Sequence, residues 1–94
     1  MHTINEMRIQ FDQAKDAKNT EKHGVSLAEA ARFEWADALT WPDQRQDYGE
    51  DRVAALGYIG DRLYFLVFVA RGQERRIISL RKANQREVRR YAET

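Results

Sequence analysis

The sequence has no cysteine and a single proline in its 94 residues. Without cysteine it can form neither disulfides nor thiolate metal sites, so a reducing compartment suits it. Its longest apolar stretch, LYFLVFVA at residues 63–70, is far too short for a membrane-spanning helix. Residues 1–15 lack the apolar run of a signal peptide. We therefore expect one globular domain over residues 1–94, located in the cytoplasm.

Histidine is scarce as well, since only His2 and His23 occur. These two residues cannot make a metal site on their own, and no pair of carboxylates is distinguished by its spacing. A glycine-rich phosphate loop is also missing. These absences argue against metal-dependent and nucleotide hydrolysis, and we expect neither a metal nor another cofactor. His23 is then the candidate for proton transfer near neutral pH, because His2 stands at the terminus.

What the chain does contain is arginine. The net charge is only +1, but twelve of the sixteen basic residues are arginine, and eight of these lie between Arg62 and Arg90. Acidic residues are concentrated earlier, within residues 43–51. A cationic C-terminal half in a nearly neutral protein suits an anionic ligand held on one face. A merely solvated charged surface is the alternative.

Local signals in the N-terminal part predict a strand followed by two helices. Residues 7–11, MRIQF, alternate apolar and polar side chains as a half-buried strand does. Asp12 suits the N-cap of a helix that Gly24 ends in a left-handed conformation. Ser26 and Glu29 have the spacing of a capping box, which predicts the start of a second helix.

The second predicted helix fades near Asp37, and from there the pattern changes to strands. Strand character is found at residues 38–41, 52–59, 62–70 and 75–82. Gly60-Asp61 is a two-residue hairpin signal, and Asn84 caps a final helix. The order predicts an α+β fold: a strand, two helices, a three- to four-stranded antiparallel sheet and a C-terminal helix. We expect the helices to cover one side of the sheet.

The segment 75–82 carries basic side chains at both ends of an apolar centre. A period of two places Arg75, Ile77, Ser79 and Arg81 on one face and Arg76, Ile78, Leu80 and Lys82 on the other. Arginine binds phosphate oxygens at two points and stays charged at any working pH. Arg75 and Lys82 fit equally well as cations that only reach into water. Arg81 fits that interpretation less well, because it follows the apolar centre beside a helix start.

Two further arginines stand at the ends of predicted strands. Arg52 begins one strand and Arg71 ends the next, and antiparallel order can bring both to the same end of the sheet as Arg76. Several arginines on adjacent strands would cradle a nucleic-acid backbone. The register that decides this cannot be read from the sequence.

Lys22 and His23 directly precede Gly24, at the end of the first predicted helix. Cations there meet the helix dipole favourably, which stabilises a helix by about 0.3–1 kcal/mol and needs no further function. A histidine beside a cation can equally serve as a proton shuttle. Both interpretations stay open from the residues alone.

Several separated segments together carry a family resemblance. They are FDQAKDAKNTEKHGVSLAEA (11–30), Arg52 with Gly57, FVARGQERRIISLRKA (68–83), Glu87, and Arg90-Tyr91. In this order the chain resembles the BrnT family of bacterial type II toxins, which are small ribonucleases related in fold to RelE. The departures are Phe11, where tryptophan is common, and Leu80, where alanine is frequent.

The resemblance implies a site and a partner. The site would comprise Lys22, His23, Arg52, Arg76 and Arg81 as catalytic residues, with Ser79 and Lys82 binding substrate. To the substrate-binding residues we add Arg71, because of its position at the end of a predicted strand. RNA can be cleaved without a metal, because the ribose 2′-hydroxyl attacks its own neighbouring phosphorus when a base, an acid and cations assist. The partner would be a BrnA-like antitoxin, in a 2:2 complex that binds promoter DNA through the antitoxin. We expect the cations to converge on one polyanion pocket within reach of His23.

Two other functions are compatible with the same residues. A non-catalytic nucleic-acid-binding module would use the arginines only to track phosphate, and a plain interaction domain would use them as a charged surface. A ribonuclease leaves new RNA ends, whereas a binding module only retards the RNA. Exposed aromatics would favour a binding module, but the aromatics of residues 63–70 are expected to be buried.

Overall fold

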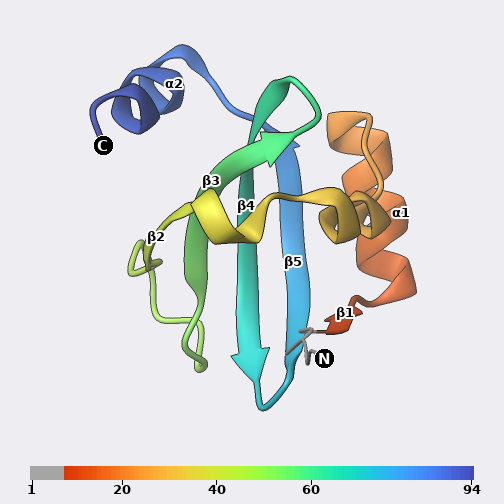
Figure 1. The fold of residues 1–94 in the computed structure, drawn as a ribbon. Coiled ribbons are helices and arrows are strands. Elements are labelled where there is room, and N and C mark those ends of the chain that lie inside the picture. The colour runs from red at the N-terminus through yellow and green to blue at the C-terminus, as the bar shows by residue number, and fades with distance from the viewer. Residues whose placement is uncertain (1–7) are drawn as a thin grey trace, which may run out of the picture.

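A five-stranded sheet with the strand order β1-β5-β4-β3-β2 organises the computed structural model, which describes residues 8–94 (Figure 1). The elements are β1 (Arg8–Gln10), α1 (Gln13–His23), the 3-10 helices η1 (Leu27–Arg32) and η2 (Trp35–Asp37), β2 (Leu39–Pro42), β3 (Val53–Ile59), β4 (Arg62–Arg71), β5 (Glu74–Lys82) and α2 (Gln85–Ala92). Strands β2 to β5 are antiparallel, and β1 adds to β5 in parallel. The predicted α+β class is confirmed, and β1 makes the sheet mixed. Two residues named in the sequence analysis, His2 and Met7, lie outside the described part.

Helix α1 begins and ends where its caps predict. The Asp12 carboxylate accepts a hydrogen bond from the Lys15 N–H (3.0 Å), and Gly24 adopts φ 74° beyond the last turn. The helix runs along the outer edge of β5 (Figure 1). There the buried Asn19 amide donates to the Leu80 carbonyl (2.8 Å) and accepts from the Leu80 N–H (3.2 Å). Asn19 thus pairs with β5 as a neighbouring strand would, beyond the point where β1 ends.

The second predicted helix is wrong in type and length, because the chain forms η1 and η2 instead. The Ser26 hydroxyl does accept from the Ala28 N–H (3.1 Å), but the Glu29 carboxylate pairs with Arg32 rather than completing a capping box. Asp16 of α1 accepts the Ser26 hydroxyl (2.9 Å) and a neighbouring backbone N–H. These hydrogen bonds to α1 fix the position at which η1 begins. From there η1 crosses in front of the sheet (Figure 1).

Both faces of the sheet bury apolar side chains. The face under η1, called the η1 face, includes Leu27, Ala30, Phe33, Ala55, Leu66, Phe68, Ile77 and Leu80. The opposite face, called the α2 face, includes Ala54, Leu56, Leu63, Phe65 and Val67, and Tyr91 of α2 packs against it. The expectation that all helices cover one side is therefore wrong for α2. The central strand β4 is buried on both faces, as predicted.

A β-bulge in β5 overturns the predicted assignment of side chains to faces. Val67 pairs with Ser79, but the next residue, Phe68, pairs with Ile77, so Ile78 has no partner across the ladder. An extra residue of this kind breaks the alternation of period two. Arg76 and Ser79 consequently share the α2 face with Arg81, whose partner is Phe65. Arg75, Ile77, Leu80 and Lys82 lie on the η1 face.

Gly57 is required by close packing. A Cβ at this position would come within 2.6 Å of the Phe33 ring, which is 3% exposed and is held edge-on by Trp35 (4.8 Å between ring centroids). We expect Gly57→Ala to lower the free energy of unfolding by about 1–3 kcal/mol, the usual cost of overpacking. Urea denaturation followed by circular dichroism measures this loss. Ala36→Ser is the control, because Ala36 is exposed and its replacement should leave stability unchanged. Gly49→Ala would not serve, because Gly49 has a φ of 73°, which strains an alanine.

Candidate functional site

The candidate cations of β5 divide between the two faces. Arg76, Ser79 and Arg81 lie together on the α2 face, whereas Arg75 and Lys82 lie on the η1 face. The Arg75 guanidinium stands 4.0 Å from the centre of the Trp35 ring, and burial lowers its pKa. For Arg75, packing on an aromatic side chain accounts for the position without a functional role.

One group of predicted residues gathers near the start of β3. Glu50 accepts from Arg52 (3.0 Å) and pairs with Arg71 (3.7 Å), so one carboxylate links two of the predicted arginines. Arg52 also lies 4.0 Å from the centre of the Tyr48 ring. Arg52 directly precedes Val53, so it lies level with Val69 on β4 and with Arg76 on β5. Two strand spacings therefore separate the backbones of Arg52 and Arg76, which is roughly 10 Å. The prediction of these arginines at one end of the sheet is confirmed.

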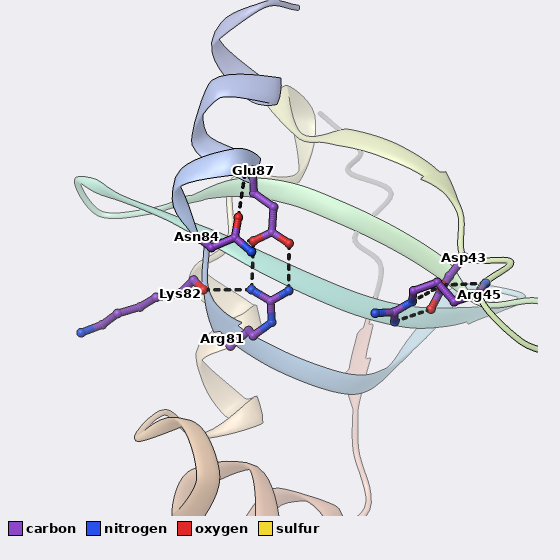
Figure 2. Close-up of polar contacts among 6 residues, drawn as sticks. All are labelled: Asp43, Arg45, Arg81, Lys82, Asn84 and Glu87. Carbon is purple, nitrogen blue, oxygen red and sulfur yellow. Dashed lines mark hydrogen bonds and ion pairs between the residues drawn. The ribbon is translucent and has the colours of Figure 1, made fainter.

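A second group gathers around Arg81 at the other end of β5. Its guanidinium forms two parallel hydrogen bonds with the Glu87 carboxylate (2.9 and 2.8 Å; Figure 2). It also lies 4.4 Å from the centre of the Phe65 ring. Burial raises the pKa of the Glu87 carboxyl, but hydrogen bonds from Arg81 and the Asn84 N–H outweigh it, so the pKa is lowered. Asn84 and Glu87 form a reciprocal capping box at the start of α2, as the predicted cap requires. Glu87 thereby fixes both α2 and Arg81.

His23 belongs to this second group. Because Asn19 lies level with Leu80, one further turn of α1 brings His23 to the height of Arg81 and Lys82. The imidazole is half-buried, and its pKa is lowered by burial and by the positive charges of Lys22 and Arg81. Lys22 and Lys82 are exposed at this end of the molecule. The neutral imidazole is therefore the dominant form at pH 7.

The two groups do not form the single pocket that was expected. Arg76 and Arg81 are on the same strand and the same face, five residues apart with the bulge between them, which separates them by roughly 13–16 Å. Ser79 lies between them on that face. This separation of the two backbone positions suits an extended polyanion that crosses the α2 face along β5 better than a single phosphate.

A hollow of about 340 Å³ opens beside Arg81 on the α2 face. We call it the α2 hollow; it is lined by Trp41, Asp43, Gln44, Arg45, Ala54, Phe65, Arg81, Arg86, Glu87 and Arg90. Arg45 forms two hydrogen bonds with the buried Asp43 carboxylate (2.7 and 2.8 Å; Figure 2) and, chiefly through the side-chain bond, lowers its pKa. The Arg90 guanidinium lies 3.9 Å from the centre of the Trp41 ring.

The sequence analysis missed most residues of the α2 hollow. Arg86 and Arg90 are four residues apart and flank Glu87, so helical spacing could have placed both on the side of α2 that carries the carboxylate. Arg45 gave no such signal, because it stands alone in an acidic loop. No helix of residues 8–94 combines the length and apolar character needed to cross a membrane. The same residues contain no cluster of three or more His, Asp or Glu side chains able to hold a metal ion.

The chain shares its fold with a small ribonuclease toxin of known structure. The crystal structure of the Brucella abortus ribonuclease toxin, BrnT, at 1.1 Å resolution, is similar to this one with a TM-score of 0.68 and 29% sequence identity. The match covers 84% of this chain and 99% of that one. The family model for "Ribonuclease toxin, BrnT, of type II toxin-antitoxin system" matches residues 11–87, and the chain belongs to the BrnT family. The comparison with curated protein sequences gives no match.

Proposed function

We propose that this ribonuclease toxin cleaves RNA by attack of a ribose 2′-oxygen on the adjacent phosphorus, without a metal ion. The bond from the 2′-oxygen to phosphorus forms as the bond from phosphorus to the 5′-oxygen breaks. The products are a cyclic 2′,3′-phosphate and a 5′-hydroxyl, and no water is consumed in this step. The observation that carries the proposal is the position of His23 at the end of α1, which Asn19 attaches to β5 at Leu80, directly before Arg81.

Each predicted residue has a place in this reaction. His23 takes the proton of the 2′-hydroxyl or gives one to the departing 5′-oxygen. Arg81 stabilises the charge that develops on the phosphorane, which arginine can do because it stays protonated. The exposed Lys22 and Lys82 add positive charge at this end.

The remaining predicted residues extend the site along the sheet. Ser79 and Arg76 lie further down β5 on the same face, and Arg52 and Arg71 follow at its far end. In this arrangement they hold the neighbouring phosphates of an extended RNA strand. Their separation from Arg81 suits substrate binding for Arg52 and Arg76 better than contact with the reacting phosphate.

The proposed partner is a BrnA-like antitoxin protein. The matched family belongs to type II toxin–antitoxin systems, which supports the expectation that an antitoxin protein inhibits this toxin. We propose a 2:2 complex that binds promoter DNA through the antitoxin. Once released from the antitoxin in the cytoplasm, the toxin would cleave RNA and thereby arrest translation and growth.

The test incubates the purified protein with end-labelled RNA in excess EDTA, with and without the antitoxin. New fragments that end in cyclic phosphate are expected without the antitoxin, and intact RNA is expected with it. Retarded but uncut RNA at high protein concentration would instead identify a non-catalytic nucleic-acid-binding module. Cleavage that EDTA abolishes would contradict the metal-free reaction.

His23 also predicts the pH dependence of cleavage. As a general base it works in its neutral form, so cleavage rises with pH through the pKa of His23 and levels off above it. Burial and the charges of Lys22 and Arg81 hold this pKa below 6.5, so the midpoint is expected below pH 6.5. Single-turnover rates and an NMR titration of the imidazole in a His2→Gln variant should give the same midpoint. A rate that falls as pH rises through that pKa would assign His23 the role of acid.

A further inference from the structure

The α2 hollow contains more positive than negative charge. Of its four guanidiniums, those of Arg45 and Arg81 are each engaged by a carboxylate, Asp43 and Glu87 respectively. In the part of the chain from residue 8 onward, the ion pairs include no partner for Arg86 or Arg90, both of which are exposed. Four cations against two anions leave two positive charges in the hollow, which favours an anionic ligand.

The hollow is also built for a flat group. Its floor contains Phe65 and Trp41, and planar guanidiniums lie against these rings: Arg81 at 4.4 Å and Arg45 at 5.7 Å from the Phe65 centre, and Arg90 at 3.9 Å from that of Trp41. A guanidinium with one face on an aromatic ring can offer the other to a nucleobase. The carboxylates of Asp43 and Glu87 hold two of these planes in place before any ligand arrives.

The size of the hollow limits what it can hold. A volume of about 340 Å³ is at the lower end of the range for small-molecule pockets, roughly 300–1,000 Å³. This suits one nucleotide unit and is too small for a base pair. A base that is paired in a helix cannot enter it, whereas an unstacked base of a single strand can.

We propose that the α2 hollow is a nucleotide subsite of the ribonuclease: it takes one unstacked base of single-stranded RNA against the guanidinium planes and that nucleotide's phosphate on Arg86 and Arg90. The inference rests on the proposed function, because Arg81 lines the hollow and also faces the phosphate to be cleaved. The bound nucleotide is therefore a direct neighbour of the cleavage point. This subsite restricts the substrate to unpaired RNA and contributes to the choice of base.

The experiment measures binding of a single-stranded RNA oligonucleotide with 2′-O-methyl ribose, which lacks the attacking hydroxyl. We expect Arg86→Gln/Arg90→Gln to bind about tenfold more weakly than the parent protein, because two phosphate contacts are lost. Arg89→Gln is the matched control, since Arg89 is exposed on the same helix but lines a different hollow. A duplex of the same sequence should bind the double variant and the control equally.

A second readout places the base. In a Trp35→Phe variant the remaining tryptophan is Trp41, in the floor of the hollow, and its emission should change when the single strand binds. Unchanged Trp41 emission on binding, or equal affinities of the double variant and the Arg89 control, would overturn the subsite. If RNA is cut in EDTA but Trp41 emission does not change, or the double variant and the Arg89 control bind equally, the subsite is wrong and the cleavage reaction stands. If Trp41 responds and RNA is never cut, the cleavage reaction fails and the subsite stands.

Discussion

Replacing Arg81 with alanine is expected to lower the single-turnover rate of RNA cleavage by about 10²–10³, the usual effect of removing one preorganised charge stabiliser. Arg81 is held by Glu87 and packed on Phe65, so its guanidinium requires little rearrangement when charge develops on the phosphate. The measurement follows end-labelled RNA at saturating protein. Arg89→Ala, at an exposed position of α2, should cleave at the parent rate.

Loss of activity must be separated from loss of structure, because Arg81→Ala leaves Glu87 without its partner. The Glu87 side chain is only 15% exposed and would keep only its hydrogen bond from the Asn84 N–H, and a largely buried carboxylate that loses its charged partner costs about 1–3 kcal/mol. Arg81→Met/Glu87→Gln removes both charges together and should restore stability without restoring cleavage. A folded double variant that cleaves RNA at the parent rate would remove Arg81 from the reaction.

Asn19→Ala is expected to give the largest loss of stability among substitutions in α1. Asn19 is the one buried residue of that helix, and its amide bonds to both backbone groups of Leu80 and to the Val25 carbonyl. Alanine would leave the buried N–H and carbonyl of Leu80 unsatisfied, which we expect to lower the free energy of unfolding by about 2–4 kcal/mol. Urea denaturation monitored by circular dichroism measures the change.

Lys18→Ala provides the control for Asn19, because Lys18 is the exposed neighbour on the same helix and should leave stability within about 0.5 kcal/mol of the parent. Cleavage by Asn19→Ala should also fall, since the helix that positions His23 loses its attachment to β5. Unchanged stability would mean that water replaces the amide between α1 and Leu80.

The features that the sequence predicted correctly depend on neighbours along the chain. The caps at Asp12, Gly24 and Asn84 each need a partner within about four residues, so the spacing was sufficient. The 3-10 conformation after Ser26 could not be predicted in this way. It follows attachment to Asp16 of α1, ten residues earlier, rather than a bond to Glu29.

The candidate site was predicted only in part, for the same physical reason. Sequence spacing identified the arginines of β5, but the bulge at Ile78 appears only when β5 pairs with β4, and it decides that Arg76 and Arg81 share a face. The α2 hollow depends on still longer contacts, because the acidic loop supplies Arg45 and α2 supplies Arg90. No local pattern specifies that these segments meet.

The attachment of α1 to β5 through Asn19 has a consequence for ionic strength. These hydrogen bonds join neutral groups, which dissolved ions screen little, whereas contacts between exposed arginines and RNA phosphates weaken as salt is added. Salt therefore acts on how tightly RNA is held and leaves the imidazole of His23 where the helix puts it. On the proposed mechanism we therefore expect concentrated salt to slow cleavage by releasing RNA, while RNA that stays bound should be cut at an unchanged rate.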